Sequence, residues 1–249
     1  MHRRPVRAAS MSADMNFFER TRQFFRRLPR LHFLRPFAVC LDWGTETSVS
    51  APGRMIATLR IRGTGNSVSI DPSSSFTGHI TVQGHNNRII IGKNCELAGE
   101  IMVKGKNQTV TIGDETTFVS VYLLCMENKD ISIGRHCMFS RDIEIRTSDA
   151  HALIDRKNGV RLNPAAPVMV GDHVWVGMRA ILNKGTVIAD DSVVGAQSFV
   201  NSAFDEGNVV IAGTPAKIIR SGVTWDRGRK PRYSRKELDS WKMPPDIGG

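Results

Sequence analysis

Apolar residues recur at a spacing of 21 residues between positions 49 and 145 of this sequence. Three sets of five carry the pattern: Val49, Ile70, Ile91, Ile112 and Ile133; Met55, Phe76, Leu97, Phe118 and Phe139; and Ile61, Val82, Val103, Leu124 and Ile145. With 41% apolar residues, such a pattern arises by chance about once in a million. The repeat therefore decides the architecture, because units of this kind bury their apolar faces by stacking on one another.

From residue 170 the spacing shortens to strict steps of six. The apolar positions are Val170, Val176, Leu182, Ile188, Val194 and Val200, with small or β-branched residues in between. Each unit of six predicts a short strand and a corner, and three units make one coil with three sides. The earlier coils carry extra residues at one corner, at 84–87 and 105–108. A fixed step of six favours a parallel β-helix over a β-sandwich, whose turns are spaced irregularly.

The residues at the expected corners fit this prediction. Gly65, Asn86, Asn107 and Asn128 recur four positions after the third set and tolerate turn conformations. Glycines 92, 113, 134, 171, 177 and 195 follow an inward apolar residue, where a crowded backbone favours a missing side chain. We assign residues 49–219 to the β-helix, 1–48 to a basic N-terminal arm and 220–249 to a short basic C-terminal tail.

The repeat is interrupted once, by the 24 residues from 146 to 169. A long excursion from a regular solenoid is usually functional or disordered. This one contains Asp149 and His151, the polar residues most suited to acid–base chemistry in the segment. We therefore expect a protruding loop that carries catalytic residues.

The net charge of +10 is concentrated at the two ends of the chain. Residues 1–36 carry +7 and residues 220–249 carry +4, so the repeat region is close to neutral. A basic groove for nucleic acid is therefore not expected. The four cysteines (Cys40, Cys95, Cys125 and Cys137) have no CxxC spacing and are predicted to be reduced packing residues. The sequence contains no run of about 18 apolar residues, so a membrane-spanning helix is not expected.

The N-terminal segment 14–35 predicts an amphipathic helix with a Phe-rich stripe flanked by arginines. Two interpretations stay open. The helix packs against its own β-helix or trimer, which we favour, or it makes a peripheral contact with an anionic membrane. In the C-terminal tail, a short helical stretch is expected near SRKELDSWK.

Three segments carry a resemblance to a known family: 133–151 (IGRHCMFSRDIEIRTSDAH), 171–200 (GDHVWVGMRAILNKGTVIADDSVVGAQSFV) and 211–227 (IAGTPAKIIRSGVTWDR). They resemble the hexapeptide-repeat acyltransferases, and most of all the O-acetyltransferases of capsule, exopolysaccharide and lipopolysaccharide biosynthesis. The resemblance implies a left-handed parallel β-helix, a homotrimer with active sites between subunits, and a cytoplasmic location, at the inner face of the membrane if segment 14–35 binds lipid. It also implies acetyl-coenzyme A as co-substrate, a carbohydrate acceptor and no metal.

The resemblance also implies roles for individual residues. His151, in the S-D-x-H loop, corresponds to the general base, with Asp149 or a loop carbonyl fixing its tautomer, and Trp175 corresponds to the substrate-side tryptophan. Contacts to coenzyme A are expected at Gly177, Met178, Ala196, Asn201, Ser202, Lys217 and Arg220. Asn201–Ser202 stand where Thr–Lys is frequent in the family, so these two are expected to bind through their backbone.

The chemistry of acetyl transfer fits these residues. A sugar hydroxyl is a poor nucleophile at neutral pH, and a neutral imidazole can take its proton as it attacks the thioester. Backbone N–H groups near Gly177 and Met178 are candidate donors to the oxyanion. No Ser or Cys lies beside the histidine in a nucleophile motif, so direct transfer in a ternary complex is expected, without an acyl-enzyme.

Three alternatives remain at this point. A γ-type carbonic anhydrase shares the fold but needs zinc held by three histidines, and His136, His151 and His173 lack the close pair of that family. A small-molecule acetyltransferase would act on serine, free sugars or antibiotics. A non-catalytic β-helix would serve as a scaffold and would not bind coenzyme A.

Overall fold

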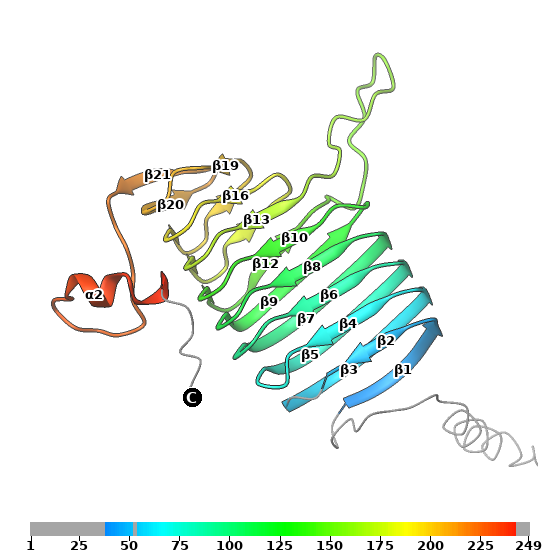
Figure 1. The fold of residues 1–249 in the computed structure, drawn as a ribbon. Helices are drawn as coiled ribbons and strands as arrows, with labels where there is room; N and C mark the ends of the chain where they lie inside the picture. Colours follow the sequence, from blue (N-terminus) through cyan, green and yellow to red (C-terminus); the bar gives the residue numbers. More distant parts are fainter. Residues whose placement is uncertain (1–37, 52–53, 243–249) are drawn as a thin grey trace, which may run out of the picture. The chain divides into compact units, whose positions relative to one another are not determined.

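The computed structural model describes residues 38–51 and 54–242, all of which belong to one compact unit (Figure 1). They form an all-β parallel solenoid of about eight coils, as the repeat predicts. The solenoid begins at Ala38, earlier than the predicted start at residue 49, because the first strand already pairs in parallel with the next coil. The left-handed coiling stays a prediction, and the predicted helix within 14–35 lies outside the described residues.

Two sheets make up the three sides of the solenoid. The larger runs through β1 (Ala38–Thr45), β3 (Arg54–Thr64), β5 (Ser75–His85), β7 (Glu96–Lys106), β9 (Thr117–Met126), β11 (Met138–Phe139), β14 (Trp175–Val176), β17 (Val193–Val194), β20 (Val209–Gly213) and β21 (Ala216–Ser221). It also includes β12 (Ile143–Arg146), β15 (Ile181–Leu182) and β18 (Phe199–Val200). The second has the order β19 (Ala203–Phe204), β16 (Val187–Ile188), β13 (Val168–Val170), β10 (Ile131–Ile133), β8 (Thr109–Ile112), β6 (Arg88–Ile91), β4 (Ser67–Ile70) and β2 (Ser48–Ser50). Only the β20–β21 pair is antiparallel among these strands.

The apolar columns predicted from the spacing are stacks of inward side chains. One column contains Met55, Phe76, Leu97, Phe118, Phe139, Val176, Val194 and Ile211. Another contains Ile70, Ile91, Ile112, Ile133, Val170, Ile188 and Phe204. All of these residues are buried, so the columns form the core.

Three residues of the 21-residue pattern are out of register. Val49 lies opposite Val68 rather than in the Ile70 column, because the first coil is shorter than the later ones. Leu124 is displaced because β9 carries an irregularity opposite Leu97–Gly99, so that Cys125 faces Val103 in its place. A bulge of this kind shifts every residue after it by one position. Ile145 is displaced as well, because it lies opposite Leu123 and therefore belongs to the Ile101 column.

The corner predictions are confirmed. Asn86, Asn107 and Asn128 have φ of 55°, 54° and 57°, and Gly65 has φ of 68°. A Cβ added to Gly134 would lie 2.4 Å from the carbonyl oxygen of Gly171, on the next coil. These positions therefore need residues that tolerate a left-handed backbone or a close approach between coils.

A ladder of buried amides fills the corner that carries the extra residues. Asn66, Asn87 and Gln108 are almost fully buried. The side-chain oxygen of Asn66 accepts from the Asn87 backbone N–H (3.0 Å), and that of Asn87 accepts from the Gln108 N–H (3.1 Å). The ladder satisfies backbone groups that the wider corner leaves without a strand partner.

Three cysteines pack in the interior, as predicted. Cys95, Cys125 and Cys137 are buried and free. Burial raises the pKa of Cys125 and of Cys137 to about 12. These thiols are therefore neutral, unreactive packing groups at physiological pH.

The C-terminal tail contains the short helical stretch expected from the sequence. It consists of α2 (Arg235–Leu238) and a 3₁₀ turn, η1 (Ser240–Lys242). Ser234 and Glu237 form a reciprocal capping box at the start of α2. Among the residues described, none forms a helix of the length and apolar character needed to cross a membrane.

Candidate active site

The interruption of the repeat forms a loop, residues 147–167, that protrudes from the solenoid between β12 and β13 (Figure 1). Its two arms are joined by a bridge between Ile154 and Arg161, and a turn at Asp155–Gly159 forms the tip. The outer part exposes aliphatic side chains, each more than half accessible: Leu153, Ile154, Val160 and Leu162. The loop therefore has its own backbone pairing and exposes aliphatic side chains below a charged and polar tip.

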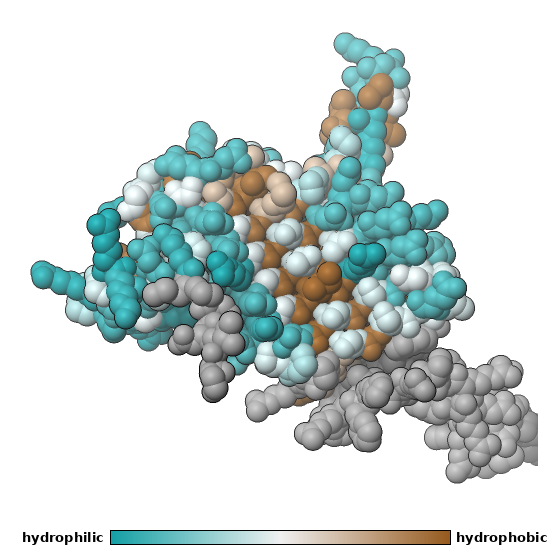
Figure 2. Space-filling model, viewed as in Figure 1, coloured by the Kyte–Doolittle hydropathy of each residue, from teal (hydrophilic) through white to brown (hydrophobic). Residues whose placement is uncertain are grey.

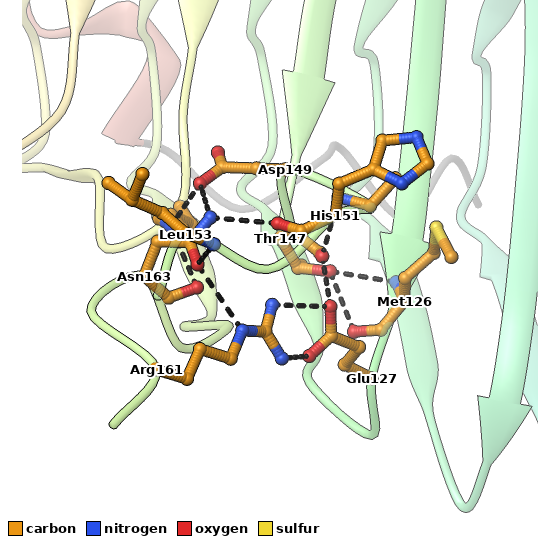
Figure 3. A network of polar contacts seen from close by, with 11 residues as sticks. Met126, Glu127, Thr147, Asp149, His151, Leu153, Arg161 and Asn163 are labelled. Carbon is orange, nitrogen blue, oxygen red and sulfur yellow. Dashed lines mark hydrogen bonds and ion pairs between the residues drawn. The ribbon is translucent and has the colours of Figure 1, made fainter. Parts of the chain in front are cut away.

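Asn163 fastens the chain on both sides of His151 (Figure 3). Its side-chain nitrogen donates to a carboxylate oxygen of Asp149 (2.7 Å) and to the backbone carbonyl of His151 (2.9 Å). Its side-chain oxygen accepts from the backbone N–H of Leu153 (2.6 Å). One amide therefore binds the Asp149 side chain before the histidine and the backbone at and after it.

Two ion pairs attach the base of the loop to the neighbouring coils. Arg161 donates to Glu127 from both terminal guanidinium nitrogens, at 2.5 and 3.0 Å. Lys184 donates to Asp149 and to the backbone carbonyl of Asn163 (3.1 Å). Because Glu127 precedes the loop in the stack of coils and Lys184 follows it, the loop base is held from both sides.

These contacts keep both carboxylates ionised. The hydrogen bonds from Arg161, and then that from Ser148, lower the pKa of Glu127 to about 2. The hydrogen bond from Lys184 is the main cause that lowers the pKa of Asp149. The stability that they contribute is present above the unfolded-state pKa and is lost as the pH falls toward the folded-state value. The loop base therefore stays charged and intact at neutral pH.

The imidazole of His151 is directed away from this network and is exposed to solvent (Figure 3). The Asp149 carboxylate binds Asn163 and Lys184, so it acts on the loop backbone and does not orient the ring of His151 in this structure. Ala150, immediately before His151, has φ of 63°, supported by a hydrogen bond from its N–H to the Ser148 hydroxyl (2.9 Å). The same left-handed conformation occurs at corners of the solenoid, such as Asn86 and His173, so it marks a tight turn immediately before the histidine.

Trp175 lies on the outer side of β14, between Met138 and Val193 of the adjacent coils. Its side chain is 38% exposed, and its ring is tilted against that of Trp225, 6.1 Å away. Within the described residues, no hydrogen bond or ring contact joins Trp175 to His151. The structure therefore assigns these two predicted residues to separate parts of one chain.

The residues expected to bind coenzyme A divide between two corners of the solenoid. Gly177, Met178 and Ala196 share the corner that follows β14 and β17, where a Cβ on Gly177 would meet the Ala196 nitrogen at 2.6 Å. Asn201 and Ser202 follow β18, at the corner from which the loop protrudes. The face formed by β12, β15 and β18 separates the two corners.

Lys217 and Arg220 lie on β21. Lys217 is opposite Ala212, whose Cβ lies 2.9 Å from where a Cβ on Gly195 would stand, and Arg220 is opposite Val210. Both basic side chains are exposed. They therefore present positive charge on the strand that ends this sheet, with Lys217 nearer to the first corner.

One of the two expected oxyanion donors is engaged elsewhere. The backbone N–H of Gly177 donates to the carbonyl of Val194 (2.8 Å), as part of the parallel ladder. The N–H of Met178 has no acceptor within the part of the chain that the structure covers. Of this pair, only Met178 retains a donor for a bound substrate.

The three histidines weighed as zinc ligands do not converge. His136 pairs with Glu115 (3.2 Å), and His173 is a buried corner residue with φ of 54° that contacts Asp191 (2.8 Å). His151 lies in the protruding loop. In the described ranges, no group of three or more His, Cys, Asp or Glu side chains is placed to hold a metal ion.

Comparison with known proteins gives sequence relatives and fold relatives. No family model matches the chain. It is 34% identical to a polysialic acid O-acetyltransferase of Neisseria meningitidis over 40% of its own length and 46% of the relative. It is 42% identical to the galactoside O-acetyltransferase of Escherichia coli K12 over 26% and 30% of the respective lengths. The matches thus span less than half of these curated relatives.

Two solved structures extend the likeness over most of the chain. The polySia-specific acetyltransferase NeuO superimposes with a TM-score of 0.75 and 26% identity, over 82% of this chain and 97% of that one. The polysialic acid O-acetyltransferase OatWY gives a TM-score of 0.66 and 27% identity, over 83% and 100%. The chain resembles O-acetyltransferases in sequence and in fold. The family resemblance predicted from the sequence is confirmed, and it favours the predicted enzyme class.

Several residues of this site were not predicted. Glu127, Arg161, Asn163 and Lys184 belong to no motif, and their contacts span up to 35 positions of sequence. Arg161 and Asn163 were at least within the predicted loop. No sequence signal marks Glu127 or Lys184, because both occupy ordinary corner positions of the repeat.

Proposed function

We propose that the protein is an O-acetyltransferase that moves an acetyl group from acetyl-coenzyme A to a sugar hydroxyl of a polysaccharide or its precursor. The observation that carries this proposal is the loop at 147–167, whose base is fixed by Asn163 and two ion pairs while the His151 imidazole is left exposed. A rigid backbone under a free imidazole suits a general base. The O-acetyltransferase relatives support the same reaction.

The reaction proceeds by direct transfer. The His151 imidazole accepts the proton of the acceptor hydroxyl as its oxygen attacks the thioester carbonyl. The N–H of Met178 stabilises the oxyanion, and collapse breaks the carbon–sulfur bond. The proton held by His151 passes to the departing thiolate. Asp149 supports this base through Asn163 rather than through the imidazole itself.

The corner after β14 and β17 fits one end of coenzyme A. Gly177 has no side chain where its backbone approaches Ala196, and the Met178 N–H is free to donate. Lys217 and Arg220 on β21 provide exposed cations for phosphate groups. Backbone groups at Asn201 and Ser202 belong to the other corner and require a second copy of the chain to complete the site.

The proposed assembly is a homotrimer with the site between subunits. The base and the coenzyme A corner occupy different edges of one chain, so a neighbouring copy brings them together. One outward column of the second sheet carries no charge: Ser50, Ser69, Ile90, Thr111, Ser132, Met169, Val187 and Ala203. The neighbouring outward column contains Arg88. Figure 2 shows an apolar and neutral band over the strands of this sheet. This band and the aliphatic outer loop are surfaces that a second copy can cover.

Sedimentation equilibrium tests the trimer. We expect about three times the chain mass of 27.6 kDa. Ser132→Arg places a charge in the middle of the uncharged band and should dissociate the assembly. Glu96→Arg, on an exposed position of the other sheet, is the matched control and should leave it intact. A wild-type monomer at assay concentration contradicts the interfacial site.

Turnover of acetyl-coenzyme A, measured as thiol release, tests the activity. The acceptor panel contains neutral and anionic bacterial polysaccharides, lipid-linked and nucleotide sugars, free sugars, serine and chloramphenicol. We expect release that depends on a polysaccharide or its precursor. Release with only the small acceptors favours the small-molecule alternative. No release together with no binding of coenzyme A favours the scaffold.

A further inference from the structure

The chain after β21 turns back onto the solenoid and buries two tryptophans. We call residues 223–242 the C-terminal strap (Figure 1, orange to red). The strap begins with a hydrogen bond from the Val223 N–H to the Asn208 carbonyl (2.9 Å). Trp225 and Trp241 are only 7% and 8% exposed. The strap is therefore attached to the solenoid through the buried side chains of Trp225 and Trp241.

Trp225 is held by a stack of aromatic rings. The His173 imidazole lies 4.4 Å from the Trp225 ring and 4.8 Å from the Trp241 ring, and both pairs are within 9° of parallel. Two indoles cannot occupy the same face of one imidazole, so His173 lies between them. The indole N–H of Trp225 also donates to the His173 carbonyl (2.8 Å). Stacking and a hydrogen bond together fix the plane of Trp225.

A buried carboxylate orients the central ring of this stack. Asp191 is 5% exposed and contacts Nδ1 of His173 at 2.8 Å. It also accepts from the Thr224 hydroxyl (2.6 Å) and the Asn208 amide (2.5 Å). Because Thr224 is the neighbour of Trp225, the same carboxylate holds both the ring and the strap.

Arg227 holds Trp225 from the side of the preceding coils. Its guanidinium lies 5.9 Å from the centre of the Trp225 ring. It donates to the Thr117 hydroxyl (2.9 Å), at the start of β9, and to the Cys137 carbonyl (3.1 Å), immediately before β11. Cation–π attraction and these two hydrogen bonds add a further restraint on the indole.

The restrained ring of Trp225 meets the partly exposed ring of Trp175, tilted by 45°. Trp175 projects from a strand of only two residues, and within the described structure Trp225 is the ring that contacts it. We propose that Trp225 is a positioning residue, which fixes the rotamer of Trp175 at the substrate side of the site. This inference rests on the proposed function, in which Trp175 borders the substrates.

Matched variants of the full chain test the proposal. Trp225→Ala should lower kcat/KM about 10²-fold, the loss typical of a reacting group displaced by about 1 Å. Trp225→Phe keeps a ring against Trp175 and should therefore retain most of the wild-type kcat/KM. Trp241→Ala removes the other ring of the same stack without touching Trp175, so it should lose thermal stability but remain within a few-fold of wild-type kcat/KM.

The NMR resonance of the Trp175 indole N–H, assigned by its loss in Trp175→Phe, reports the ring directly. We expect it to shift or broaden in Trp225→Ala and to stay unchanged in Trp241→Ala. Equal losses of kcat/KM in Trp225→Ala and Trp241→Ala would overturn the proposal, because strap stability alone would explain them. If the wild type has no turnover with any acceptor, the proposed function fails. The NMR measurement does not depend on turnover, so an unchanged Trp175 resonance in Trp225→Ala overturns the positioning role even if the proposed function fails.

Discussion

His151→Ala is expected to abolish acetyl transfer while the fold and the affinity for coenzyme A stay intact. A positioned general base contributes on the order of 10²–10⁴-fold to a rate, so kcat should fall by about this factor. The imidazole is exposed and only the backbone of His151 takes part in the network under the loop. Its removal therefore costs little stability. Thiol release, calorimetric binding of coenzyme A and a thermal melt measure the three quantities.

Asn163→Ala is the matched comparison, because it keeps the imidazole and removes the amide that fixes its backbone. The loss of its hydrogen bonds to Asp149, His151 and Leu153 should misplace the base and lower kcat by a smaller factor, about 10–100-fold. In the His151→Ala background, Asn163→Ala should cause no further loss of kcat, since Asn163 acts on the reaction only through the His151 imidazole. Turnover retained in His151→Ala would exclude it as the base.

The core of the solenoid could be predicted because its coils stack at a fixed step. A residue in an inward column must be apolar in every coil, so the pattern repeats at 21 and then at 6 positions. The three misplaced residues arise where the step itself changes. The first coil is short at Val49, and β9 is irregular before Leu124, which also displaces Ile145 on the next coil. Spacing alone gives no sign of these changes, because all three positions carry apolar residues.

The candidate site could be predicted only where a local sequence pattern marks it. The loop was visible as a gap in the repeat, and the S-D-x-H motif marked His151. The partners that hold the loop were not visible, because Lys184 reaches Asp149 from a later coil and Glu127 reaches Arg161 from an earlier one. The contact between Trp225 and Trp175 likewise depends on the path of the strap, which no periodic pattern describes.

The second large effect is expected for Gly84→Ala, at a corner where glycines of successive coils lie above one another. Gly63, Gly84 and Gly105 have φ of 109°, 123° and 150°, conformations that other residues rarely adopt. A Cβ on Gly84 would lie 1.8 Å from the carbonyl oxygen of Gly105. Backbone strain of about 1–3 kcal/mol and a similar cost for the overlap predict a loss of about 2–6 kcal/mol in the free energy of unfolding.

Gly159→Ala separates the two contributions. Gly159 also has a positive φ, 72°, but no atom lies within 4 Å of its added Cβ, at the tip of the loop. Only the cost of the left-handed conformation applies there, about 1–2 kcal/mol at most, and the tip can relax. The midpoint of urea unfolding, followed by circular dichroism, should thus fall strongly for Gly84→Ala and little for Gly159→Ala. Equal shifts would mean that the coils do not approach at this corner as the structure describes.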